Sequence, residues 1–600
     1  MKPNIPTTYY QEKTCRLWAG SSIAALIGLI ALLVLNNRLL QPVCIMLGSA
    51  STILLFRRFR KWRLESLLLK WLDKNAIYIL FIYIATLLTW YGLVLWANPY
   101  RYEINNGDAA FTTQTLYNFV NGFLPENSVF TMNGQWTTND DVRYVPNGIG
   151  YVSVFSLHQY ISPWLFTTPL YALYPEPPMH IWAIQIVTLS LGIPGIFWTC
   201  RQIGNSRLFA LACAIAFSLL PQVETQIWFQ GYFDPIALGF MPWVFGSLFG
   251  RRWICLGISA LMLALISLPF SYFVIIFGII CSIFYRATVP GIMVALIGWC
   301  VMRFDTSLFL TAYQLAQGST DHLPNFFHKY VLDRTFESFV DPFCANATYV
   351  ISMLFFVGFL PFAVTCAKKQ IDLASLGFLA ILATAFSLMM LRSTGWEANR
   401  NALFITPIFI MSVYSCTNVT NQCLNNTLMS QEFKRSCREL LLSSLGAGII
   451  FYHPYKEGPL ASHLPWGGNG TILTSRETHA WDETILILNK YVPRDAPIVW
   501  DSAPEIVAVL ANRQHNWHCG RAPKNIKYFV SVGEPRNGNE RDLRDTAILA
   551  WRNDPSARVL YEGNPGQRLL IFERSNSTLP YRHEDQLGWN IVTSALGIGK

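Results

Sequence analysis

The chain has 600 residues, of which 52% are hydrophobic and 14% are charged, and its formal net charge is +9 at pH 7. This composition argues against a series of soluble domains, because apolar stretches of the length that crosses a bilayer recur between residues 17 and 453. The sequence therefore predicts a polytopic membrane protein.

The apolar segments predict about thirteen transmembrane helices, which place the N-terminus in the cytoplasm and the C-terminus outside. Short loops rich in Lys and Arg set this orientation, and topology signalling is preferred over binding of anionic lipid or nucleic acid as their role. No cleavable signal peptide is expected. The predicted helices are 17–36, 39–56, 76–97, 178–200, 206–220, 228–250, 253–267, 269–286, 288–302, 348–366, 372–392, 402–418 and 438–453.

Three segments are too polar to cross the membrane, and the predicted topology places all three outside: 98–177, 303–347 and 454–600. Residues 1–75 are expected to hold two N-terminal helices and a basic cytoplasmic loop. Residues 76–453 would then form the helical membrane core with its outer loops. The expected fold class is an all-α membrane bundle followed by an extracytoplasmic α/β domain.

The tail from residue 454 has the pattern of that small α/β domain. Strands are predicted at 496–500 and 526–533, and helices at 503–514 and 540–554, where apolar residues recur with helical spacing. Two further strands are expected to form a closing hairpin near Asn564. The tail has neither a GxGxxG motif nor a P-loop, so nucleotide binding is not supported, and no nucleic-acid partner is expected.

The first outer loop opens with "NNGDAAFTTQTLYNFVNG", residues 105–122, which contains a single acid, Asp108. Apolar residues recur at helical spacing from Leu116 to Phe123, so residues 108–121 are predicted to form an amphipathic helix on the membrane surface. A carboxylate in its first turn could simply cap free N–H groups. The alternative is that Asp108 takes part in chemistry at the membrane surface.

Other charged groups fall on the same predicted outer face. Asp141, Arg143 and His158 follow in the first outer loop, and Asp234 lies at a span boundary in "WFQGYFDPIALGF". Each has a structural explanation, since Asp141 suits a solvated turn, His158 suits interfacial packing, and Asp234 before proline suits a helix start. An ionisable residue at membrane depth is nonetheless a candidate functional group.

The later outer segments add three more candidates. Lys329 lies in the second polar segment, and Glu397 and Arg400 stand at the outer entrance of the helix predicted at 402–418. Glu397 and Arg400 could simply pair with each other. Together with the earlier groups they predict that acids, a histidine and cations gather on one face of a large apolar bundle.

The order of these motifs resembles that of the C-type glycosyltransferases, and more closely that of an uncharacterised group of bacterial polytopic membrane proteins related to them. The matching stretches are Asp108 with Gln114, His158 with Ser162–Pro163, and Phe233–Asp234–Pro235. The resemblance covers roughly residues 76–575. One position departs from the pattern, because the group more often has histidine where this chain has Asp234.

This resemblance implies sugar transfer, with inversion, from a polyprenyl-phosphate donor at the extracytoplasmic face of the bacterial cytoplasmic membrane. Asp108 would be the catalytic base, a role that is worth about 10²–10⁴-fold in rate. Arg143, Lys329 and Arg400 would stabilise the leaving phosphate, because negative charge builds up on it. The acceptor could be a glycan, a lipid or a protein.

The remaining candidates are expected to bind substrate. Asp141 and His158 would support the acceptor or a metal, for which Mg²⁺ and Mn²⁺ are the candidates, and Glu397 and Asp234 would line the site. His158 and Asp234 are predicted to share one cavity with Asp108. A transporter or flippase of lipid-linked glycans, and a non-catalytic assembly protein with the same fold, are the alternatives.

Overall fold

The structure is a computed structural model of the whole chain. The residues it describes are 63–97, 126–127, 142–144, 151–154, 179–220, 223, 233–317, 373–392, 402–419, 438–439, 441–442, 445, 478–493, 496, 498–500, 516–518, 526–532, 538–563 and 569–575.

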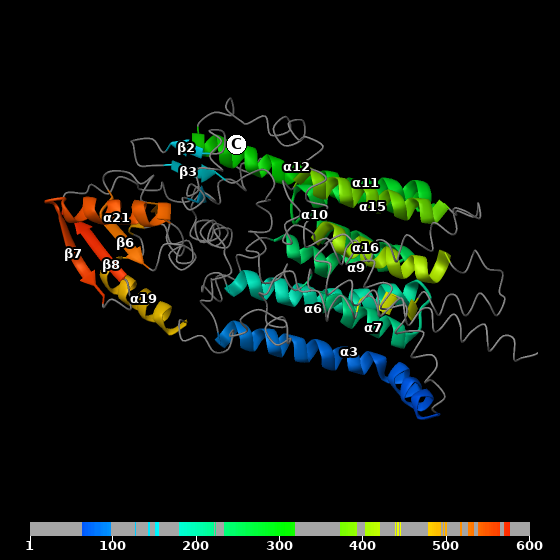
Figure 1. Ribbon diagram of the computed structural model, residues 1–600. Helices are drawn as coiled ribbons and strands as arrows, with labels where there is room; N and C mark the ends of the chain where they lie inside the picture. The colour runs from blue at the N-terminus through cyan, green and yellow to red at the C-terminus, as the bar shows by residue number, and fades with distance from the viewer. Residues whose placement is uncertain are drawn as a thin grey trace, which may run out of the picture.

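Most of the described chain is helical, and the apolar helices lie roughly side by side (Figure 1). Three of the described helices contain a window long and apolar enough to cross a membrane, at Leu67–Gly92, Ala183–Gln202 and Thr288–Leu308. Shorter apolar helices accompany them. The helices of this bundle are α3 (Arg63–Ala97), α6 (Met179–Gln202), α7 (Arg207–Ser218), α9 (Ala237–Phe249), α10 (Trp253–Ala264), α11 (Leu268–Phe284), α12 (Thr288–Gln317), α15 (Leu373–Arg392) and α16 (Ala402–Tyr414).

Small residues allow α6 and α9 to pack closely along their length. Gly239 of α9 lies against the backbone of Thr188 in α6, and a Cβ placed at Gly250, just past the end of α9, would be 3.0 Å from Gln202 Oε1 at the end of α6. Because the contacts advance together along both helices, α6 and α9 are parallel. Close approach at small residues is a common way for membrane helices to associate.

The direction of α3 follows from two hydrogen bonds to α7. The backbone N–H of Leu208 donates to Asp73 Oδ1 at 2.7 Å, and further along both helices Tyr83 Oη and Ser218 Oγ are 2.6 Å apart. The two helices are therefore parallel. Since α7 follows α6 after a short turn and runs back, α3 ends at the end of the bundle where α6 begins.

The hairpin of α11 and α12 is antiparallel. A Cβ at Gly278 would lie 2.5 Å from the Gly291 carbonyl oxygen, and one at Gly298 would lie 3.0 Å from the Ser271 carbonyl oxygen. The start of α11 and the end of α12 therefore lie at the same end of the bundle.

Described helices coincide with the predicted ones between residues 76 and 302 and at 372–392 and 402–418. For the helix predicted at 228–250 this holds from Asp234 onward, because residues 228–232 lie outside the described residues. Those at 17–36, 39–56 and 348–366 lie outside the described residues, as does most of 438–453. α3 begins at Arg63, so it crosses the boundary drawn at residue 75. The first residues of α3 are good helix formers without Gly or Pro, and the apolar pattern alone does not reveal them.

The predicted end of the helix at residue 302 is wrong, because α12 continues to Gln317 through the first part of the expected 303–347 outer loop. The expected polar segment begins with Arg303 and Asp305. In the structure a buried stripe continues past them, at Gly291, Val294, Gly298, Val301, Asp305 and Leu308. These positions alternate steps of three and four residues, which is helical spacing.

The segment 98–177 contains a three-stranded sheet that the sequence did not predict. Its strands are β1 (Glu126–Asn127), β2 (Val142–Tyr144) and β3 (Tyr151–Val154), arranged antiparallel in the order β1-β3-β2. The amphipathic helix predicted at 108–121 lies outside the described residues.

A second sheet lies in the tail, beyond one end of the helical bundle (Figure 1). Its order is β5-β4-β6-β8-β7, with β4 parallel to β5 and β6, and β8 antiparallel to β6 and β7. Helices α19 (Thr478–Tyr491) and α21 (Gly538–Arg552) accompany it. The strands are β4 (Ile498–Trp500), β5 (Asn516–His518), β6 (Tyr528–Val532), β7 (Ala557–Glu562) and β8 (Leu569–Arg574).

Most of the predicted elements of the tail coincide with described ones. The strands predicted at 496–500 and 526–533 correspond to β4 and β6, and the helix predicted at 540–554 corresponds to α21. The closing antiparallel pair corresponds to β7 and β8. β5 was not predicted, and the helix expected at 503–514 lies outside the described residues.

Phe529 stacks on Trp551 of α21 at a centroid separation of 5.5 Å, and the Arg574 guanidinium lies 3.7 Å from the centre of the same indole. Aromatic packing thus holds α21 on the sheet.

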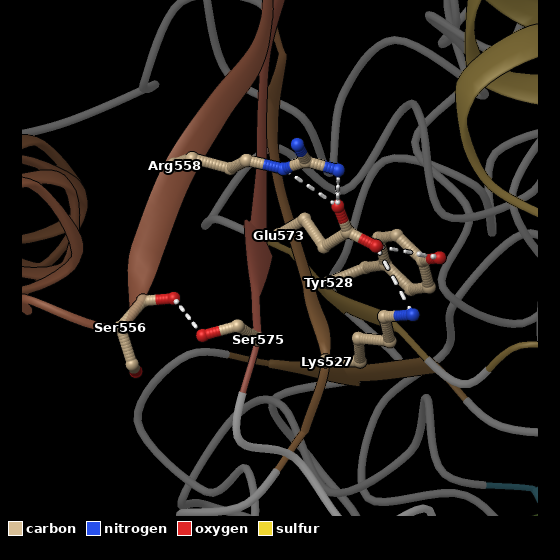
Figure 2. Close-up of polar contacts among 6 residues, drawn as sticks. All are labelled: Lys527, Tyr528, Ser556, Arg558, Glu573 and Ser575. Carbon is tan, nitrogen blue, oxygen red and sulfur yellow. Dashed lines mark hydrogen bonds and ion pairs between the residues drawn. The ribbon is translucent and has the colours of Figure 1, made fainter.

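Glu573 of β8 connects three strands on one side of this sheet (Figure 2). Arg558 of β7 donates to Glu573 Oε2 at 2.7 and 2.9 Å, and Lys527 Nζ lies 3.0 Å from Oε1. Tyr528 Oη also donates to Oε1 at 3.4 Å. At the strand ends, Ser575 Oγ donates to the Ser556 carbonyl oxygen at 3.2 Å.

Polar contacts in this sheet and in the turn before β7 shift the pKa values of three side chains. Burial acts to raise the pKa of Glu573, but hydrogen bonds from Arg558 and Lys527 outweigh it and leave that pKa lowered. The hydrogen bond to Glu573 raises the pKa of Lys527. Hydrogen bonds from the hydroxyl and the backbone N–H of Ser556 lower the pKa of Asp554.

We expect the sheet to lose stability in acid because of Glu573. A lowered folded-state pKa contributes stability above the unfolded value of about 4, and this is lost as the pH falls through the folded pKa. Glu573→Gln should cost about 1 kcal/mol at pH 7, since the Arg558 side chain is 74% exposed and solvent screens its pair. The variant should also lose less stability than the native protein between pH 5 and pH 3.

Amide exchange in β8, corrected for its intrinsic pH dependence, measures this difference in the full-length protein. Glu562→Gln is the matched control, because Glu562 is 59% exposed and pairs with Arg552 alone among the ion pairs of the described residues. If the native protein and the Glu573 variant lost the same stability between pH 5 and pH 3, Glu573 would not be the source of the acid sensitivity of the sheet. Lys527 shows the opposite dependence, because its raised pKa contributes stability that is lost only in strong alkali.

Candidate functional site

Asp234 is the predicted site residue whose side chain the structure describes. It opens the 3-10 helix η2 (Asp234–Ile236), which leads directly into α9, and it is only 3% exposed. Pro235 in the first turn suits this start, and a carboxylate in a first turn is favoured by the helix dipole. These features give the Phe-Asp-Pro motif a local structural reason, and they place a buried carboxyl group at the start of an apolar helix.

The start of a second helix meets Asp234. Ser267, the N-cap residue of α11, is buried, and its hydroxyl donates to Asp234 Oδ1 at 3.4 Å. The Ser267 carbonyl oxygen in turn accepts from the N–H groups of Phe270 and Ser271 at 3.0 and 3.1 Å. Asp234 therefore links the beginning of α9 to the turn between α10 and α11.

Two further helices enclose η2. Both α6 and α16 pack against it. On α6, Gln185 is fully buried one turn before Thr188, the residue that contacts Gly239 of α9. The Asp234 carboxyl group thus contacts Ser267 and is carried by a short helix against which α6 and α16 pack, within an otherwise apolar bundle.

A second buried acid, Asp305 of α12, lies toward the same end of the bundle. Gly298 packs beside Ser271, and Asp305 is two turns further along the antiparallel α12, in the direction of the end where α11 begins. Asp305 is only 1% exposed. Asp305 is not among the predicted site residues, because the sequence predicts residues 303–347 as a polar outer segment. Its spacing from Val301 and Leu308 is nevertheless helical and indicates that it lies on the buried face of α12.

Described helices that adjoin the candidate segments begin or end at this same end of the bundle, which we call the Asp234 end. Residues 98–178 run between the end of α3 and the start of α6, and residues from 318 onward follow the end of α12. α16 also begins there, because at its far end Thr417 donates to Asn205 in the opposite α6–α7 turn, at 3.0 Å. Every predicted site residue thus belongs to a segment attached at the Asp234 end.

The structure places Arg143 in β2, where its backbone pairs with Val152 of β3. The other predicted site residues lie outside the described residues: Asp108, Asp141, His158, Lys329, Glu397 and Arg400. The predicted cavity shared by Asp108, His158 and Asp234 therefore stays a prediction. Phe233, which precedes Asp234 in the matching motif, is buried as well.

Buried carboxyl groups such as Asp234 and Asp305 can accept hydrogen bonds from sugar hydroxyls or provide oxygen ligands to a hard cation. Among the described residues, no group of three or more His, Cys, Asp or Glu side chains is arranged to hold a metal ion. A Mg²⁺ or Mn²⁺ ion bound here would need further ligands, from the segments that carry Asp108, Asp141 and His158 or from a substrate phosphate.

Residues 105–368 match a family model described as "Predicted membrane protein (DUF2079)". The match includes the segments with Asp108, His158, Asp234 and Asp305. It confirms the predicted resemblance to an uncharacterised family of membrane proteins. No curated protein matches the sequence.

Solved structures similar to this chain include two proteins. The crystal structure of ArnT from Cupriavidus metallidurans bound to undecaprenyl phosphate is 12% identical, with a TM-score of 0.46, and the match covers 85% of this chain and 100% of that one. The cryo-EM structure of arabinofuranosyltransferase AftD from Mycobacteria is 12% identical, with a TM-score of 0.44. That match covers 78% of this chain and 40% of AftD.

Proposed function

We propose that this protein is a membrane glycosyltransferase that transfers a sugar from a polyprenyl-phosphate donor to an acceptor on the extracytoplasmic face, with inversion. The observation that carries the proposal is the position of Asp234. The motif that holds it is buried at the end of the bundle to which every segment with a candidate residue is attached. A site at a helix end suits a donor whose phosphate lies at the membrane surface and whose chain lies in the bilayer.

In the proposed reaction, Asp108 accepts the proton of an acceptor hydroxyl while the hydroxyl oxygen attacks the anomeric carbon. The bond between that carbon and the phosphate oxygen breaks, and polyprenyl phosphate leaves with the electron pair. Arg143, Lys329 and Arg400 stabilise the developing phosphate charge. Asp141, His158, Glu397 and Asp234 bind the sugar, the acceptor or a metal ion.

The distribution of charge in the described helices supports this orientation. Arg201, Arg207, Arg251, Arg252 and Arg286 lie in or beside the turns opposite the Asp234 end. Lys and Arg in short loops favour the cytoplasmic side. The Asp234 end would then face outward in a bacterial cytoplasmic membrane, together with the tail sheet.

The test is consumption of donor by the purified full-length protein in nanodiscs. Polyprenyl-phosphate sugars with a labelled sugar are supplied with an envelope extract as the source of acceptor, and released polyprenyl phosphate is measured. We expect release that depends on the protein and stops after heat inactivation. Asp545→Asn controls for the effects of mutation and purification alone, because Asp545 is an exposed acid on α21 of the tail.

Two other outcomes separate the alternatives. A flippase would move labelled donor between the leaflets of a vesicle without breaking the sugar–phosphate bond. A non-catalytic assembly protein would neither consume the donor nor move it. Either result, across donors with different sugars, would contradict the proposed function.

A further inference from the structure

The end of the bundle opposite Asp234 is strongly basic. Its described cations are Lys70, Lys74, Arg201, Arg207, Arg251, Arg252, Arg286 and Arg438, and its described acids are Asp73 and Glu439. One of these acids already has a structural role, because Asp73 accepts the hydrogen bond from the Leu208 N–H. We call this region the basic end. Orientation in the membrane explains its charge but does not explain the geometry of two of its arginines.

Arg251 and Arg286 both have left-handed backbone conformations, with φ angles of 51° and 52°. They are the non-glycine residues with positive φ among the described parts of the chain, and each lies just past the end of an apolar helix. Glycine adopts this conformation without steric cost, whereas other residues rarely do. Gly250 directly precedes Arg251 but has a φ of −80°, so arginine occupies the position that favours glycine.

An aromatic contact connects the two turns that carry these arginines. Phe249, two residues before Arg251, contacts Tyr285, which directly precedes Arg286, at a ring-centroid separation of 6.4 Å. Phe249 also stacks on Tyr414 at 5.5 Å. This aromatic packing fixes both turns, while the side chains of Arg251 and Arg286 are exposed.

Exposed apolar side chains adjoin the same turns. Ile254, which follows the first turn, is 82% exposed, and Val289, which follows the second, is 72% exposed. Ile283 before the second turn is exposed as well. Two guanidinium groups thus stand beside apolar surface of the kind that contacts acyl chains.

We propose that Arg251 and Arg286 together bind the phosphate of an anionic phospholipid at the basic end. A guanidinium group forms paired hydrogen bonds to phosphate oxygens, and two adjacent groups can share one headgroup. The acyl chains would lie along the exposed side chains near Ile254 and Val289. This site is separate from the proposed sugar-transfer site and does not depend on it.

The experiment compares thermal unfolding of the full-length protein in detergent with added phosphatidylglycerol or phosphatidylcholine. We expect phosphatidylglycerol to raise the unfolding midpoint more, and we expect this difference to shrink in high salt. In the Arg251→Gly/Arg286→Gly double variant the apparent affinity for phosphatidylglycerol should fall about tenfold or more, since each arginine near an anionic surface contributes appreciably to binding.

The glycine substitutions also report on folding. In phosphatidylcholine the double variant should be at least as stable as the native protein, because glycine relieves the left-handed strain at both positions. An Arg544→Gln/Arg552→Gln variant, which removes the same charge from α21, should keep the full response to phosphatidylglycerol. An equal response in all three proteins, or a response reproduced by inorganic phosphate alone, would overturn the proposal.

Discussion

Replacing Asp108 with asparagine is expected to lower sugar transfer by about 10²-fold or more while the protein stays folded. Asparagine has nearly the shape of aspartate, but its amide cannot accept a proton from the acceptor hydroxyl. If Asp108 only capped a helix, the change would shift stability by a few tenths of a kcal/mol at most, because asparagine caps about as well as aspartate. Release of polyprenyl phosphate and the unfolding midpoint, measured on the same preparation, separate the two explanations.

Asp545→Asn provides the matched comparison for this measurement. It makes the same chemical change at an exposed residue of α21, where the carboxylate pairs only with its neighbour Arg544 among the described ion pairs. Its turnover should equal that of the native protein. An Asp108→Asn protein that folds normally and transfers sugar at the native rate would return Asp108 to the role of a helix cap.

The sequence predicted the helical bundle well because hydropathy reports burial in lipid directly. It was less informative wherever a helix continued beyond its apolar window, as α3 does before residue 76 and α12 does after residue 302. Hydropathy averages over a window, so Arg303 and Asp305 lowered it and hid a stripe of buried positions that continues to Leu308. The spacing of the buried positions, rather than the average hydropathy, indicates that α12 continues past residue 302.

Short strands were the other difficulty. β4 and β6 are buried apolar runs and were predicted, whereas β5 has the sequence Asn-Trp-His and β2 has Val-Arg-Tyr, and neither alternates clearly over enough residues. Pairing with neighbouring strands defines these elements. Such pairing joins residues that are distant in sequence, so local patterns do not contain it.

For the candidate site, the sequence identified Asp234 as an acid at a membrane boundary, and the structure buries it there. It could not show that Ser267 of α11 would contact Asp234, because this contact depends on how α9, α10 and α11 pack. The position of the helix ends is also a consequence of helix direction. Parallel packing of α3 with α7, and of α6 with α9, brings the end of α3 and the starts of α6 and α9 to one end of the bundle.

That packing gives the second large expected effect, a loss of stability on substituting alanine for Gly239. A Cβ at this position would overlap the methyl group and carbonyl oxygen of Thr188 and would lie 2.9 Å from its carbonyl carbon. Backbone cannot move aside as a flexible side chain can, so α6 and α9 must separate. Overpacking of this kind costs about 1–3 kcal/mol, more than alanine gains over glycine within a helix.

Gly257→Ala is the control that isolates this effect. Gly257 lies within α10, and a Cβ there would meet only Ile297 Cδ1, at an ordinary 3.8 Å. Its unfolding midpoint should therefore equal or exceed that of the native protein, while that of Gly239→Ala falls. Gly239 lies five residues after Asp234 at the start of α9, so displacement of the helix should also move this carboxyl group and reduce donor consumption. Equal midpoints for the two alanine variants would show that α6 and α9 do not pack at Thr188 and Gly239. The position of Asp234 beside α6 depends on the same packing and would then be wrong as well.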